Sequence, residues 1–197
     1  MLVPMRAILD AADKNGYAQG AFNVNAVCQV KAAVDVHQIL RSPAIIQGAD
    51  LANGFMGGRT DFANSTLEDK KAGAKNIGAA VKKYAADSDI PVALHLDHGK
   101  NFDSCIAAIE GGYTSVMIDG SSLPFDENVE LTREVVKYAH ERGVTVEGEL
   151  GVLAGVEDHV FAATSTYTNP LSAIDFFKKT GVDALAISYG TCLLYTS

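Results

Sequence analysis

Two histidines and an aspartate lie within five residues in the segment His95-Leu-Asp-His-Gly99. Imidazole nitrogens and carboxylates are ligands that zinc accepts, and imidazole also exchanges protons near neutral pH. If the segment ends a β-strand, side-chain alternation places His95 and Asp97 on one face and His98 on the other. All three side chains can therefore serve one site only if the strand breaks at Gly99 and redirects His98.

Further carboxylates follow apolar segments later in the chain. Asp119 closes the run Val116–Ile118, where it is either the cap of the following turn or a metal ligand. Glu147 and Glu149 alternate onto the same face of a predicted strand, and both cannot be buried and ionised without a cation. Glu157 lies in a long connection with little periodicity, where it is either an acid–base group or a solvated surface residue.

The elements that must position these residues are six short apolar runs, which predict strands, and the helical patterns between them. The predicted strands are Gly20–Val24, Ala44–Gln47, Val92–His98, Ser115–Asp119, Thr145–Leu150 and Ala184–Ser188. The predicted helices are Val27–Leu40, Asp69–Ala86, Asp103–Ile109, Glu127–Arg142 and Pro170–Thr180. Because strands and helices alternate, we expect parallel βαβ units, arranged as a doubly wound sheet or as a (β/α)8 barrel.

The positions of the polar residues favour the barrel. Polar or ionisable side chains end four of the six predicted strands, among them Asn23 and Asn25 on the first strand. The carboxyl ends of barrel strands converge on one site, whereas an open sheet concentrates its chemistry at one crevice. The glycine-rich phosphate loop that usually accompanies such a crevice is missing from the sequence. The chain has 197 residues, which is short of the about 250 that a complete barrel needs.

Composition narrows the possible functions. Sixteen basic and 24 acidic residues give a net charge of −8, which disfavours partners such as nucleic acid or a membrane surface. No apolar run approaches the ~18 residues that span a bilayer, and Asp10 comes too early for a secretory signal. The three cysteines are far apart and odd in number, so we expect no disulfide framework and a reducing, cytoplasmic location.

The ordered set of motifs resembles the class II, zinc-dependent fructose-bisphosphate aldolase family, which includes the closely similar tagatose-bisphosphate aldolases. The resemblance covers nearly all of residues 1–191 and rests on the segments Gly16–Asn25, Ser42–Ile46, His95–Gly99, Thr114–Asp119, Pro124–Asn128, Val146–Gly151 and Gly155–Asp158. It implies a sugar bisphosphate substrate and, in the intact protein, reversible cleavage of fructose 1,6-bisphosphate to dihydroxyacetone phosphate and glyceraldehyde 3-phosphate. It also implies a homodimer or a larger assembly.

The resemblance implies a metal centre and an acid–base group. His98 is similar to one of three histidines that hold the catalytic Zn²⁺. Asp119 and Glu149 are similar to carboxylates that hold an alternative or second metal position, for a divalent or a monovalent cation. Asp97 resembles the group that takes the proton from the C4 hydroxyl as the C3–C4 bond breaks.

Two further roles follow from the same resemblance. Glu157 is similar to the loop glutamate that exchanges the proton at C3 of the dihydroxyacetone phosphate unit, and Asn25 is similar to a substrate contact. Ala49 departs from the family, because relatives often have a substrate-contacting serine there. Three other functions stay open: a preference for tagatose 1,6-bisphosphate, a metal-free sugar-phosphate lyase, and a non-catalytic binding domain of the same fold.

The resemblance stops after Tyr189–Thr191. The family continues there into a His-Gly pair that supplies the second zinc histidine, whereas Cys192–Ser197 resembles a translated sequencing adaptor. We therefore predict an incomplete TIM-barrel domain over residues 1–191, with about six of eight β/α units, and a non-native tail over residues 192–197. One zinc histidine is too few for a catalytic ion, so we expect the 197-residue chain itself to be inactive.

Overall fold

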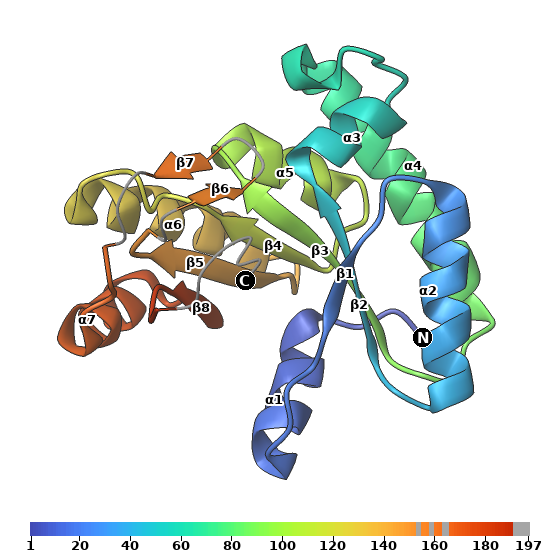
Figure 1. Cartoon of the computed structure of the whole chain (residues 1–197), viewed down its shortest axis with the longest axis horizontal. Helices are drawn as coiled ribbons and strands as arrows, with labels where there is room; N and C mark the ends of the chain where they lie inside the picture. The colour runs from blue at the N-terminus through green and yellow to red at the C-terminus, as the bar shows by residue number, and fades with distance from the viewer. Residues whose placement is uncertain (153–154, 158–159, 163–165, 191–197) are drawn as a thin grey trace.

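Six strands form one parallel sheet in the computed structural model of the chain, and their order in space follows their order in the sequence (Figure 1). The structure describes residues 1–152, 155–157, 160–162 and 166–190, with side chains described in 1–152 and 166–190. The strands of this sheet are β1 (Ala21–Asn23), β2 (Ala44–Ala49), β3 (Val92–Gly99), β4 (Ser115–Ile118), β5 (Thr145–Leu150) and β8 (Ala184–Ile187). Every neighbouring pair is parallel, so the predicted partial (β/α)8 barrel is confirmed.

Helices connect consecutive strands, as parallel pairing requires. The connecting helices are α2 (Val27–Leu40), α4 (Leu67–Ala86), α5 (Phe102–Glu110), α6 (Phe125–His140) and α7 (Pro170–Thr180). Side-chain caps fix where α4, α5 and α7 begin, and at α7 the Oδ1 of Asn169 accepts a hydrogen bond from Leu171 N at 2.8 Å. Oγ1 of Thr66 accepts a hydrogen bond from Asp69 N at 3.2 Å, and Oδ1 of Asn101 accepts one from Ser104 N at 2.9 Å. Each such cap contributes about 1 kcal/mol to stability.

The structure adds elements that were not predicted. They are the helices α1 (Met5–Asn15) and α3 (Asp50–Met56), the 3-10 helix η1 (Phe62–Asn64) and the antiparallel strands β6 (Gly155–Glu157) and β7 (Val160–Ala162). The helical spacing of Met5, Ile8 and Ala12, all buried, is a signal that could have found α1. The short elements offer no such periodicity. The predicted boundary after residue 191, and the tail beyond it, lie outside the described residues.

The main hydrophobic core lies between the sheet and the connecting helices. Ile46, Leu94, Val116 and Val146 come from four neighbouring strands and are fully buried in this layer. Burying a side chain of this size stabilises the fold by about 1.5–3 kcal/mol. This core between sheet and helices therefore holds the strands in place. The opposite, inner face of the sheet is left for polar side chains.

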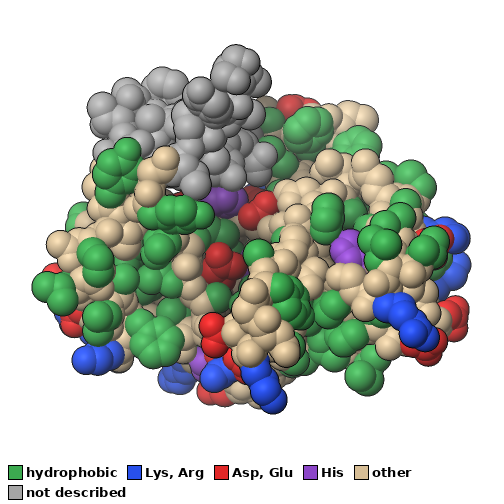
Figure 2. All heavy atoms as spheres, turned by 60° about the horizontal axis from the view of Figure 1, so that its bottom comes forward, with side chains coloured by type: hydrophobic (Ala, Val, Ile, Leu, Met, Phe, Trp, Pro, Cys, Tyr) green, Lys and Arg blue, Asp and Glu red, His purple; other side chains and the backbone are tan. Residues whose placement is uncertain are grey.

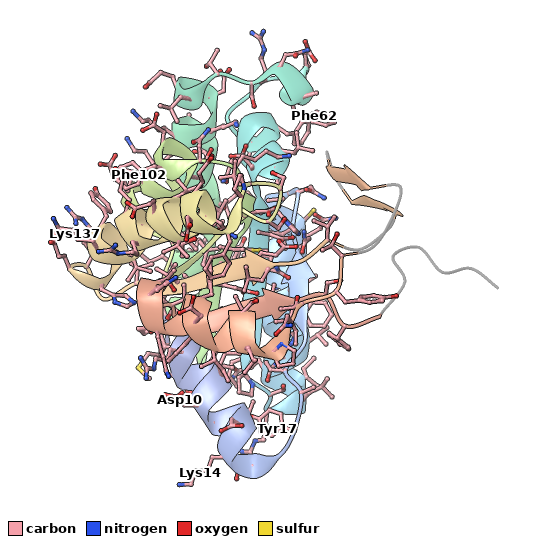
Figure 3. The ribbon with its side chains drawn as sticks, turned by 90° about the vertical axis from the view of Figure 1, so that its left-hand side faces the viewer. Asp10, Lys14, Tyr17, Phe62, Phe102 and Lys137 are labelled. Atoms are coloured by element: carbon pink, nitrogen blue, oxygen red, sulfur yellow. The ribbon has the colours of Figure 1, made fainter. Side chains whose placement is uncertain are left out.

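Helix α1 covers the amino-terminal end of the strands. Met5 and Ile8 pack with Ile45 and Ala93 in a hydrophobic cluster separate from the main core. Figure 3 shows α1 at one end of the sheet and Phe62 at the opposite end. Because apolar side chains close the α1 end, a polar site belongs at the carboxyl ends of the strands.

Asp183, in the turn before β8, ties α1 to later elements. Its carboxylate accepts hydrogen bonds from Nη1 of Arg6 at 2.9 Å, from Nε2 of His140 at 2.9 Å and from Val146 N at 2.8 Å. The backbone N–H of Arg6 also donates to Oγ1 of Thr145 at 3.1 Å. Only 6% of the Asp183 side chain is exposed. The network joins α1, β5, α6 and the turn before β8.

The outer edges of β1 and β8 pair with no other strand among the residues that the structure describes. Such edges leave backbone N–H and C=O groups without ladder partners. Separately, no helix in the described part of the chain has the length and apolar character needed to cross a membrane.

Candidate active site

Side chains from three adjacent strands converge at the carboxyl end of the sheet. His98 comes from β3, Glu149 from β5, and Asp119 follows β4 directly. Nδ1 of His98 lies 3.1 Å from Oδ2 of Asp119 and 3.6 Å from Oε2 of Glu149. One ligand atom from each of the three residues lies within 4.8 Å of the others. In Figure 2, a histidine side chain lies next to acidic side chains near the centre of the view.

A β-bulge brings His98 into this cluster. The register passes from Leu96 opposite Val116 to Gly99 opposite Ile118, so β3 contains one residue more than β4 over this stretch. His98 has a φ of 49°, a left-handed conformation that costs a non-glycine residue roughly 1–2 kcal/mol. The redirection of His98 that a shared site requires is therefore present, and it comes from the bulge, because β3 continues through Gly99. Gly99 is required there, since a Cβ would lie 2.6 Å from the backbone oxygen of Met117.

The cluster holds opposite charges close together. Burial alone would lower the pKa of His98, but the hydrogen bond to Asp119 and the charges of Asp97 and Glu149 outweigh burial and raise the pKa to about 9. Burial likewise raises the pKa of Asp119, but hydrogen bonds from His98 and Ser121 hold it well below its usual range. His98 is consequently a cation at neutral pH when no metal is bound, and Asp119 is an anion.

Asp119 serves as turn cap and as a member of the cluster at once. Its Oδ1 accepts hydrogen bonds from the backbone N of Ser121 at 3.1 Å and from Oγ of Ser121 at 2.6 Å, while Oδ2 faces His98. The cap that the sequence offered as one alternative is thus present, and the metal-ligand role of Asp119 stays a prediction. The turn fixes the carboxylate, and a fixed carboxylate loses less entropy when it binds a cation.

The donor set of the cluster fits a divalent metal ion. One imidazole and two carboxylates suit Zn²⁺ and other divalent first-row metals, and the three side chains are only 11–19% exposed. A cation between the two carboxylates would also compensate their charge in a partly buried place. His98, Asp119 and Glu149 are therefore the residues that could hold a metal ion here.

Asp97 lies beside the cluster, and a residue of β1 holds its carboxylate from across the inner face of the sheet. Its Oδ1 is 3.9 Å from Nε2 of His98, and its Oδ2 accepts a hydrogen bond of 2.8 Å from Nδ2 of Asn23. Asn23 was predicted only as a polar residue near a strand end, so its contact with Asp97 was missed. No sequence signal reports this contact, because the two residues lie on strands separated by β2.

Glu147 and His95 form a deeper layer below the cluster. Oε2 of Glu147 lies 3.5 Å from Nε2 of His95, and Nδ1 of His95 lies 2.8 Å from Oγ of Ser115. Burial and the charge of His98 lower the pKa of His95 to about 3, and burial and the charge of Asp97 raise that of Glu147 to about 7. Glu147 and Glu149 thus share a face, as predicted, but only Glu149 reaches the cluster.

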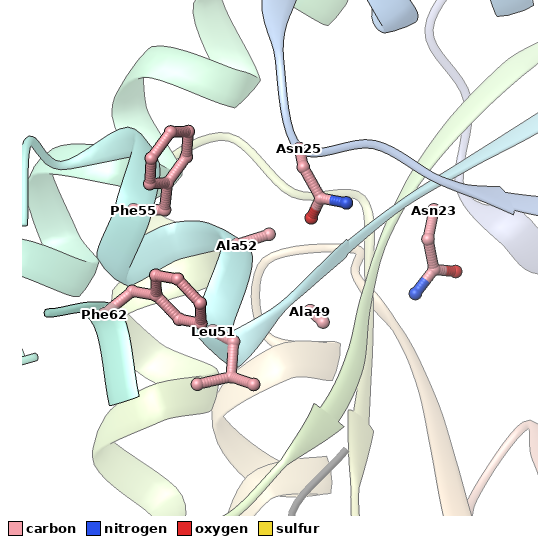
Figure 4. A pocket seen from close by; sticks show the side chains of 7 residues that line it. All are labelled: Asn23, Asn25, Ala49, Leu51, Ala52, Phe55 and Phe62. Carbon is pink, nitrogen blue, oxygen red and sulfur yellow. The ribbon is translucent and has the colours of Figure 1, made fainter. Parts of the chain in front are cut away.

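A pocket of about 360 Å³ adjoins the site at the ends of β1 and β2 (Figure 4). Two phenyl rings, an isobutyl group, two methyl groups and two amides line it: Asn23, Asn25, Ala49, Leu51, Ala52, Phe55 and Phe62. Asn25, the predicted substrate contact, therefore lines a pocket that shares Asn23 with the Asp97 hydrogen bond. Glu157 ends β6, and its side chain lies outside the described residues, so its predicted role stays a prediction.

Comparison with known proteins identifies relatives of this chain. The family model described as "Fructose-bisphosphate aldolase class-II" matches residues 3–193. A fructose-bisphosphate aldolase of Treponema pallidum is 48% identical over 194 residues, which are 96% of this chain and 54% of the relative. One from Geobacillus stearothermophilus is 40% identical over 192 residues, covering 96% of this chain and 62% of the relative.

A solved structure has a similar fold. The crystal structure of the YdjI aldolase from Escherichia coli K12 matches with a TM-score of 0.78 and 31% identity, covering 100% of this chain and 64% of that one. The chain therefore spans between about half and two thirds of the length of the relatives that it matches.

Proposed function

The chain belongs to the class II fructose-bisphosphate aldolase family, and we propose that it supplies the acid–base and metal-holding part of an enzyme that reversibly cleaves fructose 1,6-bisphosphate. The products would be dihydroxyacetone phosphate and glyceraldehyde 3-phosphate. The single observation that carries the proposal is the convergence of Asp97, His98, Asp119 and Glu149 at the carboxyl end of the strands. A cytoplasmic location and a homodimer or larger assembly are further parts of the proposal.

The resemblance to the family gives each residue its role in the cleavage. Asp97 takes the proton from the C4 hydroxyl as the C3–C4 bond breaks. The electrons of that bond move toward the C2 carbonyl. Zn²⁺ or another divalent ion held by His98, with Asp119 and Glu149, would supply Lewis-acid stabilisation of that negative charge. Asn25 contacts the substrate, and Glu157 returns a proton to C3 to complete dihydroxyacetone phosphate.

The test needs a complete barrel. We would join residues 1–190 to the part of the Treponema pallidum relative that follows the matched segment, and check folding by circular dichroism and cooperative unfolding. This completed barrel should release dihydroxyacetone phosphate from fructose 1,6-bisphosphate and lose that activity to a chelator. Asp97→Asn should reduce the rate by roughly 100-fold or more, whereas Asp13→Asn, at an exposed position of α1, should not. The 197-residue chain alone should be inactive.

Other results would change the proposal in defined ways. Faster cleavage of tagatose 1,6-bisphosphate would replace the substrate, and activity that survives the chelator would indicate a metal-free lyase. A folded, completed barrel that cleaves neither bisphosphate would contradict the proposed activity and favour a non-catalytic binding domain.

A further inference from the structure

Asn23 and Asp97 are joined by a hydrogen bond that crosses an intervening strand. Asn23 belongs to β1 and Asp97 to β3, and β2 lies between them. In the register, Asn23 stands opposite Gln47 and Asp97 stands opposite Ala49. Nδ2 of Asn23 nevertheless reaches Oδ2 of Asp97 at 2.8 Å. The contact is therefore made across the inner face of the sheet, and not between paired neighbours.

We propose that Asn23 is a positioning residue for Asp97. Its amide fixes Oδ2, which leaves Oδ1 directed toward His98 at 3.9 Å from Nε2. The role deepens the proposed function, because it matters for catalysis only if Asp97 is the acid–base group. A carboxylate that must accept one proton from one hydroxyl works best in a fixed orientation, and a displacement of about 1 Å can cost roughly 100-fold in rate.

The surroundings of Asp97 explain why the donor is a neutral amide. Glu147 and Glu149 lie on the same inner face, so a carboxylate at position 23 would add a further negative charge beside Asp97. An amide donates a hydrogen bond to the carboxylate without adding a charge. Asn23 also lines the pocket that holds Asn25, so the group that orients Asp97 faces the space that a substrate would fill.

A purely structural role of Asn23 predicts different effects on unfolding and on the catalytic constants. Asn23 is exposed on an edge strand, so replacing it should cost little stability. If the residue only supported the fold, its loss would alter unfolding and leave the catalytic constants of the folded enzyme alone. If it positions Asp97, its loss should lower kcat while KM and unfolding stay nearly unchanged.

The first measurement uses the 197-residue chain and needs no activity. The side-chain amide signals of Asn23, assigned by their loss in Asn23→Ala, are followed in a ¹H–¹⁵N spectrum. Asp97→Ala should shift these signals, and so should Asp97→Asn, a second variant that is nearly isosteric with the parent. Asp13→Ala, at an exposed aspartate on α1, should leave them in place. Unshifted Asn23 signals in both Asp97 variants would overturn the proposal.

The second measurement uses the completed barrel. Asn23→Ala should lower kcat by roughly 10- to 100-fold with KM changed less than about threefold, and Asn23→Gln, which keeps the amide, should recover part of the loss. Asn15→Ala is the matched control, because Asn15 is an exposed asparagine whose amide donates to Ala11 O at 2.7 Å. An unchanged kcat in Asn23→Ala would overturn the positioning role. A completed barrel that is inactive with Asn23 present would instead contradict the proposed function, and the amide signals would still decide whether Asn23 holds Asp97.

Discussion

Nδ1 of His98 lies 3.1 Å from Oδ2 of Asp119, and the imidazole is protonated at neutral pH in this arrangement. The pair is charge-assisted, because a cationic donor faces an anionic acceptor. A metal ion binds a neutral imidazole, so His98 must lose a proton before it can hold one. Proton and metal therefore compete for His98, and this competition can be measured.

Metal affinity should rise with pH. The pKa of His98 is about 9, so a proton must leave the imidazole whenever a divalent ion binds below that pH. The affinity of the 197-residue chain for Co²⁺ should increase by roughly tenfold per pH unit between pH 6 and pH 8. Titration by absorption spectroscopy would measure it, with His98→Ala as the variant that loses binding. An affinity independent of pH would contradict this account.

Glu147 should make the metal-free chain less stable as pH rises. Burial and the charge of Asp97 raise its pKa to about 7 in the folded state, against about 4.3 for an unfolded glutamate. The folded state therefore binds more protons between these values, so this carboxyl's contribution to stability falls as pH rises from about 4.3 to 7. At pH 8, Glu147→Gln should be more stable than the parent chain, by at most about 4 kcal/mol.

Urea unfolding at pH 5 and pH 8 with a chelator present would measure the effect of Glu147. The difference between variant and parent should be larger at pH 8 than at pH 5. Glu134→Gln, at an exposed position of α6, is the control and should show no such difference. Equal differences at the two pH values would rule out a buried, titrating Glu147.

Removing the Asp183 carboxylate should destabilise the chain. Asp183→Ala leaves Val146 N without its side-chain acceptor at a nearly buried position, which should cost about 2 kcal/mol. Arg6→Ala should cost less than about 1 kcal/mol, because the Arg6 side chain is 63% exposed. Denaturant unfolding of both variants would measure the two losses of stability. A larger loss for Arg6→Ala than for Asp183→Ala would contradict this prediction.

Gly78→Ala should destabilise α4 although alanine is the better helix former. The propensity gain is about 1 kcal/mol. The new Cβ, however, would lie 2.0 Å from the backbone oxygen of Gly111, so helix and turn must separate. We expect a net loss of about 1–3 kcal/mol by thermal or urea unfolding. Lys75→Ala, at an exposed position of the same helix, should be neutral or slightly stabilising, and a stabilised Gly78→Ala would disprove the close contact.

The repeating part of the fold could be predicted from the sequence because it follows simple periods. Apolar runs gave all six strands of the sheet, and α2 and α7 begin and end where the patterns indicate. The helix α3 and the strand β6 are too short for a period to be visible. Tertiary packing determines whether such short elements form, whereas the local conformational preference of their residues does not.

The candidate site was only partly predictable for a related reason. Strand-end position gave His98, Asp119 and Glu149, because parallel strands bring their carboxyl ends together. The left-handed φ of His98 and the bond from Asn23 to Asp97 depend on how strands shift and curve past one another. Neither property can be predicted from the spacing of residues along one strand.

The order of the strands also bears on how the chain folds during synthesis. Each strand from β2 to β8 pairs with the strand of the sheet made just before it, so the sheet can grow unit by unit as the chain emerges. Helix α1 breaks this rule, because Arg6 takes partners that follow it by 139 and 177 residues. Helix α1 can therefore pack on β2 and β3 early, through Met5 and Ile8, whereas its hydrogen bonds to Thr145 and Asp183 can form only after β5 and the turn before β8 have been made.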